Sequence, residues 1–456
     1  MKRLKFFAIF LALAMVAAAC GSDSDDTTTT TGSAPPAATT TTTGTTPPTP
    51  TIPDAEPGEI VVMAKWGASG GEGAAFLQVL DAFTAASGID VNFVGVGDQL
   101  PTILSTQVAG GQPPDVAVLP QSGLLNDLVS LGALFPIETA AGDEMDAHFS
   151  PAWRELGSVD GTLYGVFFKV ANKSTVWYDV NAFSDNAITP PATWADWVSV
   201  SGDLLDAGVT PVAVGGADGW TLSDWFENIY LRTAGPETYD QLSRHEIPWT
   251  DQSVRDAFET MGEIIGNDDF VARGLSGALQ VGFGDSVKLV FGDSPEAAIV
   301  YEADFVEGVI LNETSAQPGT DFDFFAFPSI GGSDPGYTLT GGDVAVVLKD
   351  NPEAMALVEY LATPEAAEIW AALGGFSSAN KDVDSSIYAT DLGRRAVEGM
   401  VNATAVRYDM GDIMPSAFGS TGGSGFWGGL QDWLENPSDL DNVLATMEAE
   451  AAAAFE

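Results

Sequence analysis

The stretch Glu59-Ile-Val-Val-Met-Ala-Lys-Trp66 decides the fold, together with the glycine-rich segment and the helical pattern that follow it. Its apolar run predicts a buried strand over 59–66, and the glycines of 67–73 predict a loop. Apolar residues then recur at helical spacing over 74–87, and Gly88 ends the helix. Residues 89–94 alternate as a second strand. Strand, helix and strand at this spacing predict a parallel α/β sheet.

The same alternation recurs farther along the chain. A helix is expected over 100–109 and a third strand over 115–119. The pattern continues after Tyr164, and again where a strand at 343–348 precedes a helix at 352–362. We find no internal repeat. The fold class is therefore α/β, with sheets flanked by helices.

Length and composition narrow the class of protein. The chain has 456 residues and 45% apolar residues, which suits two domains with cores of their own. Its net charge of −47 repels phosphate backbones, so we expect no nucleic-acid partner. With one cysteine and two histidines, a disulfide framework and the usual zinc sites are excluded. We expect no metal and no cofactor.

The first residues resemble a bacterial lipoprotein signal. Basic residues precede an apolar run over 6–18, which is too short to span a bilayer as a permanent helix. Small residues then lead to Cys20, as in the lipobox, where the cysteine is lipidated and becomes the new N-terminus. We expect a signal peptide over 1–19 and an extracytoplasmic protein anchored to the cell membrane by lipid on Cys20. A plain secretory signal with an incidental cysteine is the alternative.

A tether is expected between this anchor and the folded body, over residues 20–57. Positions 21–57 hold 14 Thr and 7 Pro, and Ile52 is their only large apolar residue. Such a segment cannot bury enough surface to offset its chain entropy, and its prolines favour extended conformers. The body after it would be held away from the membrane.

A series of motifs then carries a resemblance that covers residues 58 to 456. In chain order they are Gln112-Pro-Pro-Asp115, Tyr164-Gly-Val-Phe-Phe-Lys169, Val176-Trp-Tyr178, Pro191-Ala-Thr-Trp194, Gly341-Gly342-Asp343, Asp350-Asn-Pro-Glu-Ala, Phe376-Ser377-Ser378, Arg407-Tyr-Asp-Met-Gly-Asp412 and Phe426-Trp427. Their order resembles the extracytoplasmic solute-binding proteins of ABC importers, family 1, the sugar-binding branch. The last two are similar to its alpha-glucoside-binding subgroup. The chain departs from many relatives at Phe167, where proline is frequent, and at Glu302, where amides are common.

The resemblance implies a two-lobed, periplasmic-binding-protein-like fold of type II with a hinge cleft between the lobes. The first lobe would hold 58–170 and 336–376, and the second 174–330 and 380–456. Ligand would close the lobes by a hinge motion, and the closed form would dock on the permease.

Candidate ligand-binding residues follow the expected strands, because loops at the carboxyl ends of strands line the cleft in open α/β sheets. Trp66 and Glu72 flank the first loop, and Gln121 follows the third strand. Tyr301 and Glu302 follow a strand expected over 297–300. Core packing is the alternative for Trp66, and a helix-terminus charge is the alternative for Glu72.

Aromatic residues beside a carboxylate suit a sugar, since an aromatic face stacks on a pyranose ring and the carboxylate binds hydroxyl groups. Trp220, Asp224 and Trp225 form such a group after a strand over 211–214. Packing inside a helix is the alternative for both tryptophans.

Two glycines and the few basic residues complete the set. Gly341 and Gly342 would let the backbone approach a ligand, and Asp343 would accept hydrogen bonds from its hydroxyls. Lys169, near the first crossing between lobes, and Arg407 are candidates because cations are scarce in this chain. The alternative for Arg407 is an ion pair with Asp409 or Asp412.

The loop Gly67-Ala-Ser69-Gly-Gly71 also fits the nucleophile elbow of a serine hydrolase. A serine hydrolase of this kind needs a catalytic histidine near the end of the chain, whereas His148 and His245 both lie in its middle part. We therefore expect no enzyme.

The sequence thus predicts a monomeric, lipid-anchored receptor that captures a sugar, with an oligosaccharide or alpha-glucoside as the expected class, and delivers it to ABC permease subunits. Two alternatives stay open. In the first, the same fold binds a cationic ligand such as a polyamine, because the chain is acidic. In the second, the protein is a surface glycosidase.

Overall fold

Two mixed β-sheets form the framework of residues 58–68, 71–333 and 336–456, which the computed structural model describes. The first sheet contains β1 (Glu59–Ala64), β2 (Asp90–Gly95), β3 (Val116–Leu119), β6 (Gly165–Asn172), β11 (Tyr337–Val347) and β12 (Ala405–Tyr408). Its order is β12-β11-β3-β1-β2, with β6 also paired to β11. The second sheet has the order β10-β7-β9-β8, from β10 (Phe322–Ala326), β7 (Thr175–Asp179), β9 (Ile299–Tyr301) and β8 (Val212–Ala213).

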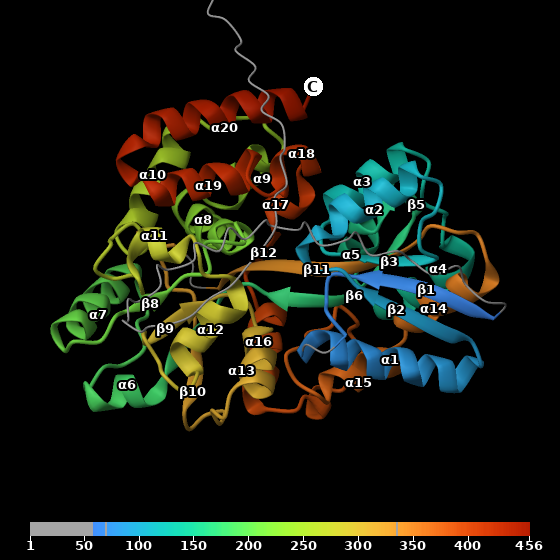
Figure 1. Ribbon diagram of the computed structural model, residues 1–456, viewed down its shortest axis with the longest axis horizontal. Helices are drawn as coiled ribbons and strands as arrows, with labels where there is room; N and C mark the ends of the chain where they lie inside the picture. Colours follow the sequence, from blue (N-terminus) through green and yellow to red (C-terminus); the bar gives the residue numbers. More distant parts are fainter. Residues whose placement is uncertain (1–57, 69–70, 334–335) are drawn as a thin grey trace, which may run out of the picture. The chain divides into compact units, whose positions relative to one another are not determined.

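Strand β1 is apolar throughout because both of its faces are covered. Ile60, Val62 and Ala64 point into one hydrophobic core, and Met63 points into another. The first core is closed by α1 (Gly71–Ser87), α4 (Glu138–His148), α14 (Pro352–Leu361) and α15 (Pro364–Ala371). The second is closed by α2 (Leu100–Ala109) and α3 (Ser122–Ser130). In Figure 1, α1 and α15 lie on one side of these strands and α2 and α3 on the other.

The second sheet is covered in the same way. Val176 of β7 belongs to one core, and its neighbour Trp177 belongs to the core on the opposite face. The larger core is built by α7 (Trp194–Asp206), α8 (Trp220–Thr233), α9 (Pro236–Ser243), α10 (Gln252–Gly262), α19 (Gly425–Glu435) and α20 (Leu440–Ala454). The smaller one is built by α12 (Phe283–Phe291) and α13 (Val306–Glu313).

The remaining elements are short or connect the others. They are the hairpin β4 (Ser158–Val159) and β5 (Thr162–Leu163), with α5 (Pro151–Leu156), α6 (Val180–Asp185), α11 (Gly274–Ala278), α16 (Asp391–Val401), α17 (Met410–Ile413) and α18 (Ser416–Gly419). Among the described residues, no helix is both long and apolar enough to cross a membrane.

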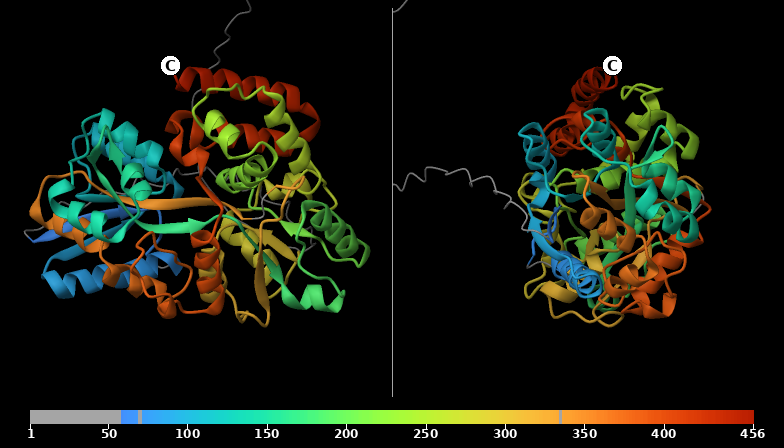
Figure 2. Two further views of the ribbon diagram at one scale, coloured as in Figure 1. Left: turned by 180° about the vertical axis from the view of Figure 1, so that it is seen from behind. Right: turned by 90° about the vertical axis from the view of Figure 1, so that its right-hand side faces the viewer.

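Strands β6 and β11 lead from one sheet to the other. They pair antiparallel from Gly165 opposite Val346 to Asn172 opposite Thr340, and Figure 2 shows them side by side. After β6, only Lys173 and Ser174 separate the first sheet from β7 of the second. This short link places residues at the end of β6 between the two groups of helices.

The fold class expected from the sequence is confirmed, with one correction to the sheet. Strands β1, β2 and β3 are parallel, as the alternation of strands and helices predicts. The prediction of a parallel sheet is wrong for β11, which runs antiparallel to β3 and to β6. The reason is the path of the chain before β11. The chain enters β11 from β10 of the second sheet, and not from a helix packed on the first sheet. The predicted signal peptide, Cys20 and the tether lie outside the described residues.

Candidate functional site

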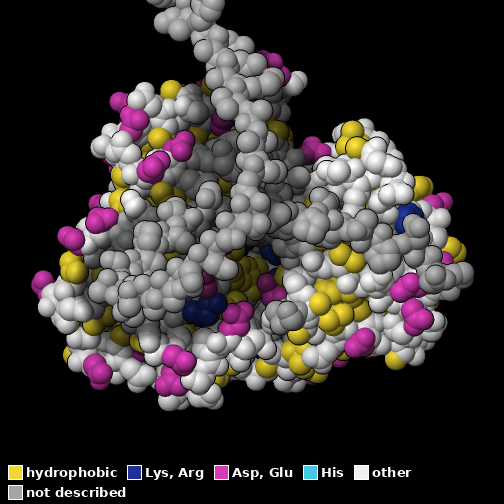
Figure 3. Space-filling view, in the orientation of Figure 1, with side chains coloured by type: hydrophobic (Ala, Val, Ile, Leu, Met, Phe, Trp, Pro, Cys, Tyr) yellow, Lys and Arg dark blue, Asp and Glu magenta, His cyan; other side chains and the backbone are white. Residues whose placement is uncertain are grey.

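A cavity of about 440 Å³ lies where the carboxyl ends of β1, β2 and β3 face helices of the second group. Its floor comes from β6 and β11, and its far wall comes from the start of α8, the loop after β9, α17 and α19. The face drawn in Figure 3 is hollowed near its middle, where basic, acidic and hydrophobic side chains adjoin. Six charged side chains line the cavity: Lys65, Lys169, Lys173, Asp218, Asp343 and Asp412.

Lys169 anchors one end of the floor. Its Nζ lies 3.1 Å from Asp343 Oδ2 and 3.1 Å from Glu72 Oε1. The same nitrogen lies over the rings of Trp66, Phe305 and Trp370, 5.4 to 5.8 Å from their centroids. Burial alone would lower the pKa of Lys169, but the Asp343 and Glu72 carboxylates outweigh it and hold the pKa above its ordinary value. This lysine is therefore a fixed cation.

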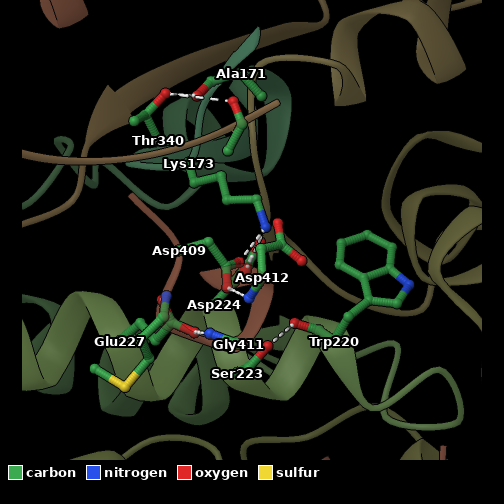
Figure 4. Close-up of polar contacts among 12 residues, drawn as sticks. Ala171, Lys173, Trp220, Ser223, Asp224, Glu227, Thr340, Asp409, Gly411 and Asp412 are labelled. Carbon is green, nitrogen blue, oxygen red and sulfur yellow. Dashed lines mark hydrogen bonds and ion pairs between the residues drawn. The ribbon is translucent and has the colours of Figure 1, made fainter. Parts of the chain in front are cut away.

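Lys173 anchors the other end of the floor, among more carboxylates. Its Nζ lies 2.9 Å from Asp224 Oδ1 on α8 and 2.5 Å from Asp409 Oδ2, which directly precedes α17. The Asp409 carboxylate also accepts a hydrogen bond from the backbone N–H of Asp412, at 2.9 Å. Figure 4 shows the three aspartates gathered around the Lys173 ammonium group. Segments far apart in the chain thus meet at one cation.

The acids around Lys173 differ in protonation. Burial raises the pKa of Asp224 to about 7, although Lys173 opposes the change. Burial and the neighbouring Asp409 raise the pKa of Asp412 well above its ordinary value. Burial acts on Asp409 too, but Lys173 outweighs it and lowers the pKa of that carboxyl. Lys173 therefore forms its firm ion pair with Asp409, and the surplus acids bind protons more readily than ordinary carboxyl groups do.

Aromatic surface borders the charged floor. Trp220 is the first residue of α8, and its ring packs 5.1 Å from Phe283 and 6.0 Å from Phe305. Gly219, with φ of +75°, turns the chain into this helix, and a Cβ there would lie 3.0 Å from Cβ of Trp427. The close contact holds Trp427 beside the start of α8. Trp220, Phe305 and Trp427 all line the cavity.

Six of the candidates predicted from the sequence line this cavity: Gln121, Lys169, Trp220, Gly341, Gly342 and Asp343. The role of Gly341 differs from the one expected. A Cβ at Gly341 would lie 2.7 Å from Cε of Lys173, so the absent side chain leaves room for the lysine stem.

Four other candidates lie one layer behind the lining. Glu72 pairs with Lys169, and Asp224 is fully buried under Lys173. The Tyr301 hydroxyl donates a hydrogen bond to the Lys173 carbonyl at 2.7 Å. Burial and the neighbouring Asp224 raise the pKa of Glu302 well above its ordinary value. These groups surround the lysines that line the cavity.

The remaining three candidates lie away from the lining. Trp66 is in the core of the first sheet, 5.1 Å from the Trp370 ring. Trp225 stacks on Trp197 in the larger core of the second sheet, at 5.1 Å. Both match the core-packing alternative, because each tryptophan has a ring partner on the inner side of its element.

Arg407 also has a partner other than the expected ones. On β12, its Nε donates a hydrogen bond to Asp240 Oδ1 at 2.6 Å, and not to Asp409 or Asp412. The reason is topological, since β12 places the guanidinium beside α9.

Six charged or aromatic lining residues were absent from the candidates: Lys65, Asp218, Phe305, Lys173, Asp412 and Trp427. For each of the last three, the sequence contains a feature that could have identified the residue as a site candidate. Lys173 sits at the expected crossing between lobes, and Asp412 and Trp427 belong to motifs that carry the family resemblance.

The residues of the hydrolase alternative are scattered. Ser69 lies outside the described residues. His148 Nδ1 lies 2.7 Å from Asp382 Oδ2, and His245 Nε2 lies 3.2 Å from Glu448. Neither histidine lines the cavity.

Comparison with known proteins gives a consistent result. A family model described as bacterial extracellular solute-binding protein matches residues 67–368. The osmoprotective compounds-binding protein GgtB of Synechocystis sp. is 36% identical, over 81% of this chain and 87% of its own length. The alpha-glucosides-binding periplasmic protein AglE of Rhizobium meliloti is 32% identical, over 86% of each chain.

Solved structures share the fold at lower identity. The bacterial solute receptor AcbH, which is described as preferring β-D-galactopyranose, superimposes with a TM-score of 0.78 at 20% identity. That match covers 87% of this chain and 99% of the receptor. A chitin oligosaccharide binding protein gives a TM-score of 0.75 at 19% identity, over 87% and 98% of the two chains.

Proposed function

Because the chain belongs to the bacterial extracellular solute-binding proteins of ABC transporters, we propose that it captures a neutral sugar and delivers it to a permease. The expected class is an alpha-glucoside or a short oligosaccharide. AglE, which is described as binding alpha-glucosides, supports this class, and GgtB, which is described as binding osmoprotective compounds, does not contradict it. Family members and relatives are binding proteins, so we also propose that the protein performs no chemistry.

The charge balance of the cavity is the observation that carries the proposal. Three lysines and three aspartates line it, so the formal charges of the lining cancel in a chain with a net charge of −47. A cavity for a polyamine would instead need an excess of ionised carboxylates. A neutral solute suits such a surface.

The aromatic and polar surfaces suit a sugar in particular. The ring of Trp220 offers a face on which the C–H side of a pyranose stacks. Charged hydrogen-bond partners such as Asp343 bind hydroxyl groups more strongly than neutral ones do. Because a sugar has little apolar area, its affinity must come from many such bonds, and a micromolar constant corresponds to about −8 kcal/mol.

We propose a capture cycle of the hinge type. Residues 58–170 and 336–376 would form one lobe, and 174–330 and 380–456 the other. Sugar in the cavity would contact both lobes and favour their closure about β6 and β11. The closed monomer would then dock on the permease. Lipid on Cys20 and the tether over 20–57 would keep it at the outer face of the cell membrane.

A thermal-shift screen tests the proposal. The probes are glucose, maltose, trehalose, sucrose, longer maltodextrins and putrescine, each at low and high salt. A ligand at a hundred times its Kd adds about 2.7 kcal/mol to the free energy of unfolding, which raises Tm visibly. We expect a rise with one saccharide that survives high salt. A rise with putrescine alone, abolished by salt, would contradict a neutral ligand. Turnover of a nitrophenyl glycoside would contradict a purely binding role.

A further inference from the structure

One helix of the second group binds three of the links that connect the two sheets. These are the link between β6 and β7, the link between β10 and β11, and the link between β12 and α17. The helix is α8, which starts at Trp220 in the cavity lining and is buried over 221–232. The same element therefore contacts both the cavity and the segments about which the proposed lobes would move.

Asn228 binds the link between β6 and β7. Its Nδ2 donates a hydrogen bond to the Lys173 carbonyl at 2.7 Å, and its Oδ1 accepts one from Ser174 Oγ at 2.7 Å. The Ser174 hydroxyl in turn accepts a hydrogen bond from the backbone N–H of Leu339 on β11, at 2.9 Å. Since the Lys173 ammonium group also pairs with Asp224, α8 holds this link through both the backbone and the side chain of the lysine.

Arg232 binds both ends of the link between β10 and β11. It follows Asn228 by four residues, so the two side chains lie on the same face of α8. One terminal nitrogen of the guanidinium donates to the Tyr337 carbonyl at 2.6 Å and to the Phe327 carbonyl at 3.4 Å. The other donates to Asn228 Oδ1 at 2.9 Å. The planar fork of an arginine suits several acceptors at once, and here it joins two links through one side chain.

Arg232 is also a buried cation whose partners are carbonyl oxygens. It is 4% exposed, and burial lowers its pKa to about 10. No carboxylate in the described ranges forms an ion pair with it. Burial of a guanidinium without an opposite charge opposes folding, so stability alone would favour an apolar side chain of similar volume. An arginine at this position therefore points to a role in fixing the two carbonyls.

Glu227 binds the link between β12 and α17. Its carboxyl oxygens accept hydrogen bonds from the backbone N–H groups of Met410 at 2.7 Å and Gly411 at 3.2 Å. Figure 4 shows the contact with Gly411, and Trp220 on the same helix. Strand β12 belongs to the first sheet, whereas the Met410 side chain lies in the larger core of the second. Side chains within residues 227–232 of α8 thus hold all three links.

We infer that Glu227, Asn228 and Arg232 are positioning residues that clamp the three links to α8 and so set the angle between the two sheets. This inference rests on the proposed function and deepens it, because it assigns the hinge of the capture cycle to one helix. None of the three residues lines the cavity. They act on solute binding through the population of the arrangement in which both sides of the cavity meet the solute.

Distances between two spin labels measure the clamp directly. The full chain with Cys20→Ser has no cysteine, so Leu131→Cys and Leu205→Cys can each carry one label. Leu131 directly follows α3 beside the first sheet, Leu205 lies on α7 beside the second, and both are exposed. Double electron–electron resonance gives the distribution of distances between the labels. It is recorded without sugar and with the saccharide of the thermal-shift panel that binds the wild type most tightly.

Three variants of the labelled chain each remove one member of the clamp. Arg232→Met keeps the long stem, Asn228→Leu keeps the volume, and Glu227→Gln keeps one acceptor oxygen. We expect each variant to broaden the distance distribution of the unliganded chain, because one link is released from α8. We also expect the Kd for the saccharide to rise about three- to tenfold in titration calorimetry, since the arrangement that binds is less populated.

Ile229→Val is the matched control on the same helix. Ile229 is fully buried in the larger core of the second sheet, so the loss of one methyl group should lower Tm. The distance distribution and the Kd should stay as in the wild type. Broadening in Ile229→Val equal to that in the clamp variants would reveal a general loosening and overturn the inference.

Wild-type distributions in the clamp variants would also overturn the inference, while the proposed function would stand. If one of the three variants does not fold, the other two decide. If no saccharide binds the wild type, the proposed function fails, but the distributions of the unliganded chains still test the clamp. The two failures are therefore distinguishable.

Discussion

The two lysines of the cavity floor lie four residues apart on the same stretch of chain, yet their surroundings differ. Lys169 has two carboxylate partners and three aromatic rings, and one partner, Glu72, keeps a side chain that is 23% exposed. Lys173 lies beside Asp224 and Asp409, both almost fully buried, with Asp412 next to them. Lys65 Nζ lies 4.0 Å from Asp343 Oδ1, so the first cluster holds two lysines and two carboxylates and is balanced in formal charge, whereas the second has surplus acid. From this difference we expect the folded state to depend more strongly on Lys173 than on Lys169, and to depend on pH through the acids around Lys173.

The largest expected effect comes from removing the cation of the acidic cluster. Lys173→Met leaves Asp224 and Asp409 buried without an opposite charge, and we expect the free energy of unfolding to fall by about 3–5 kcal/mol. Lys169→Met should cost about 1–3 kcal/mol, because Glu72 remains in contact with water. Urea denaturation at pH 7 measures both. Equal losses would break the comparison.

The second effect is a pH dependence that the acidic cluster confers. The pKa of Asp224 is about 7 in the folded chain and about 3.9 when unfolded, so its contribution to stability is complete below pH 4 and is lost as the pH rises through 7. Asp224→Asn should reduce this loss between pH 4 and 7 by roughly 2–4 kcal/mol. Denaturation midpoints across that window measure the effect.

Asp409→Asn gives the opposite sign and serves as the comparison within the cluster. The folded pKa of Asp409 is lowered, so its contribution is present above its unfolded pKa of about 4 and is lost as the pH falls through the folded value. The variant should therefore lose more stability at pH 7 than at pH 3. Parallel pH profiles for both aspartate variants would contradict the assignment of roles.

The third prediction concerns the glycine that makes room for Lys173. Gly341→Ala brings a Cβ within 2.7 Å of the Lys173 stem, and we expect a loss of about 1–3 kcal/mol in the free energy of unfolding. The control is Gly202→Ala on α7, where a Cβ meets no atom within 4 Å, and which should not destabilise the chain. In the double variant with Lys173→Ala, which removes Cδ and Cε of the stem, the cost of Gly341→Ala should disappear.

The smallest effect is expected outside both clusters. Arg407→Gln breaks a pair with Asp240 whose side chains are 27% and 34% exposed, so the free energy of unfolding should change by about 1 kcal/mol or less. Sugar affinity should stay at the wild-type value in calorimetry. A marked loss of affinity would show that Arg407 takes part in ligand binding, and would contradict its placement outside the site.

The sequence predicted elements whose pattern is local. The helix expected over 74–87 is found as α1 over Gly71–Ser87, and the expected strand over 89–94 is β2 at Asp90–Gly95, because apolar spacing determines which residues can be buried together. The direction of β11 was beyond such reasoning. It depends on pairing with β3 and β6, whose residues lie more than 150 positions earlier in the chain.

The same distinction holds at the candidate site. Gln121 was found because it follows a recognisable strand, and Asp343 because it follows two glycines. The tryptophans could not be sorted by sequence, since Trp66 faces Trp370 and Trp225 faces Trp197 only after folding. Lys173 was missed as a site residue because its partner Asp409 lies 236 residues away. Residue type predicted which side chains are able to bind a sugar, but tertiary contacts determine which of them line the cavity.

The cancelling charges of the cavity have a kinetic consequence. Ligands that carry charge are steered into a binding site by its field, and their association rate then changes steeply with the salt around them. A neutral solute entering a site whose three lysines offset its three aspartates gains no such acceleration and suffers no such dependence. The occupancy of such a site by a neutral solute would follow the concentration of that solute alone, even where the surrounding water alternates between fresh and saline.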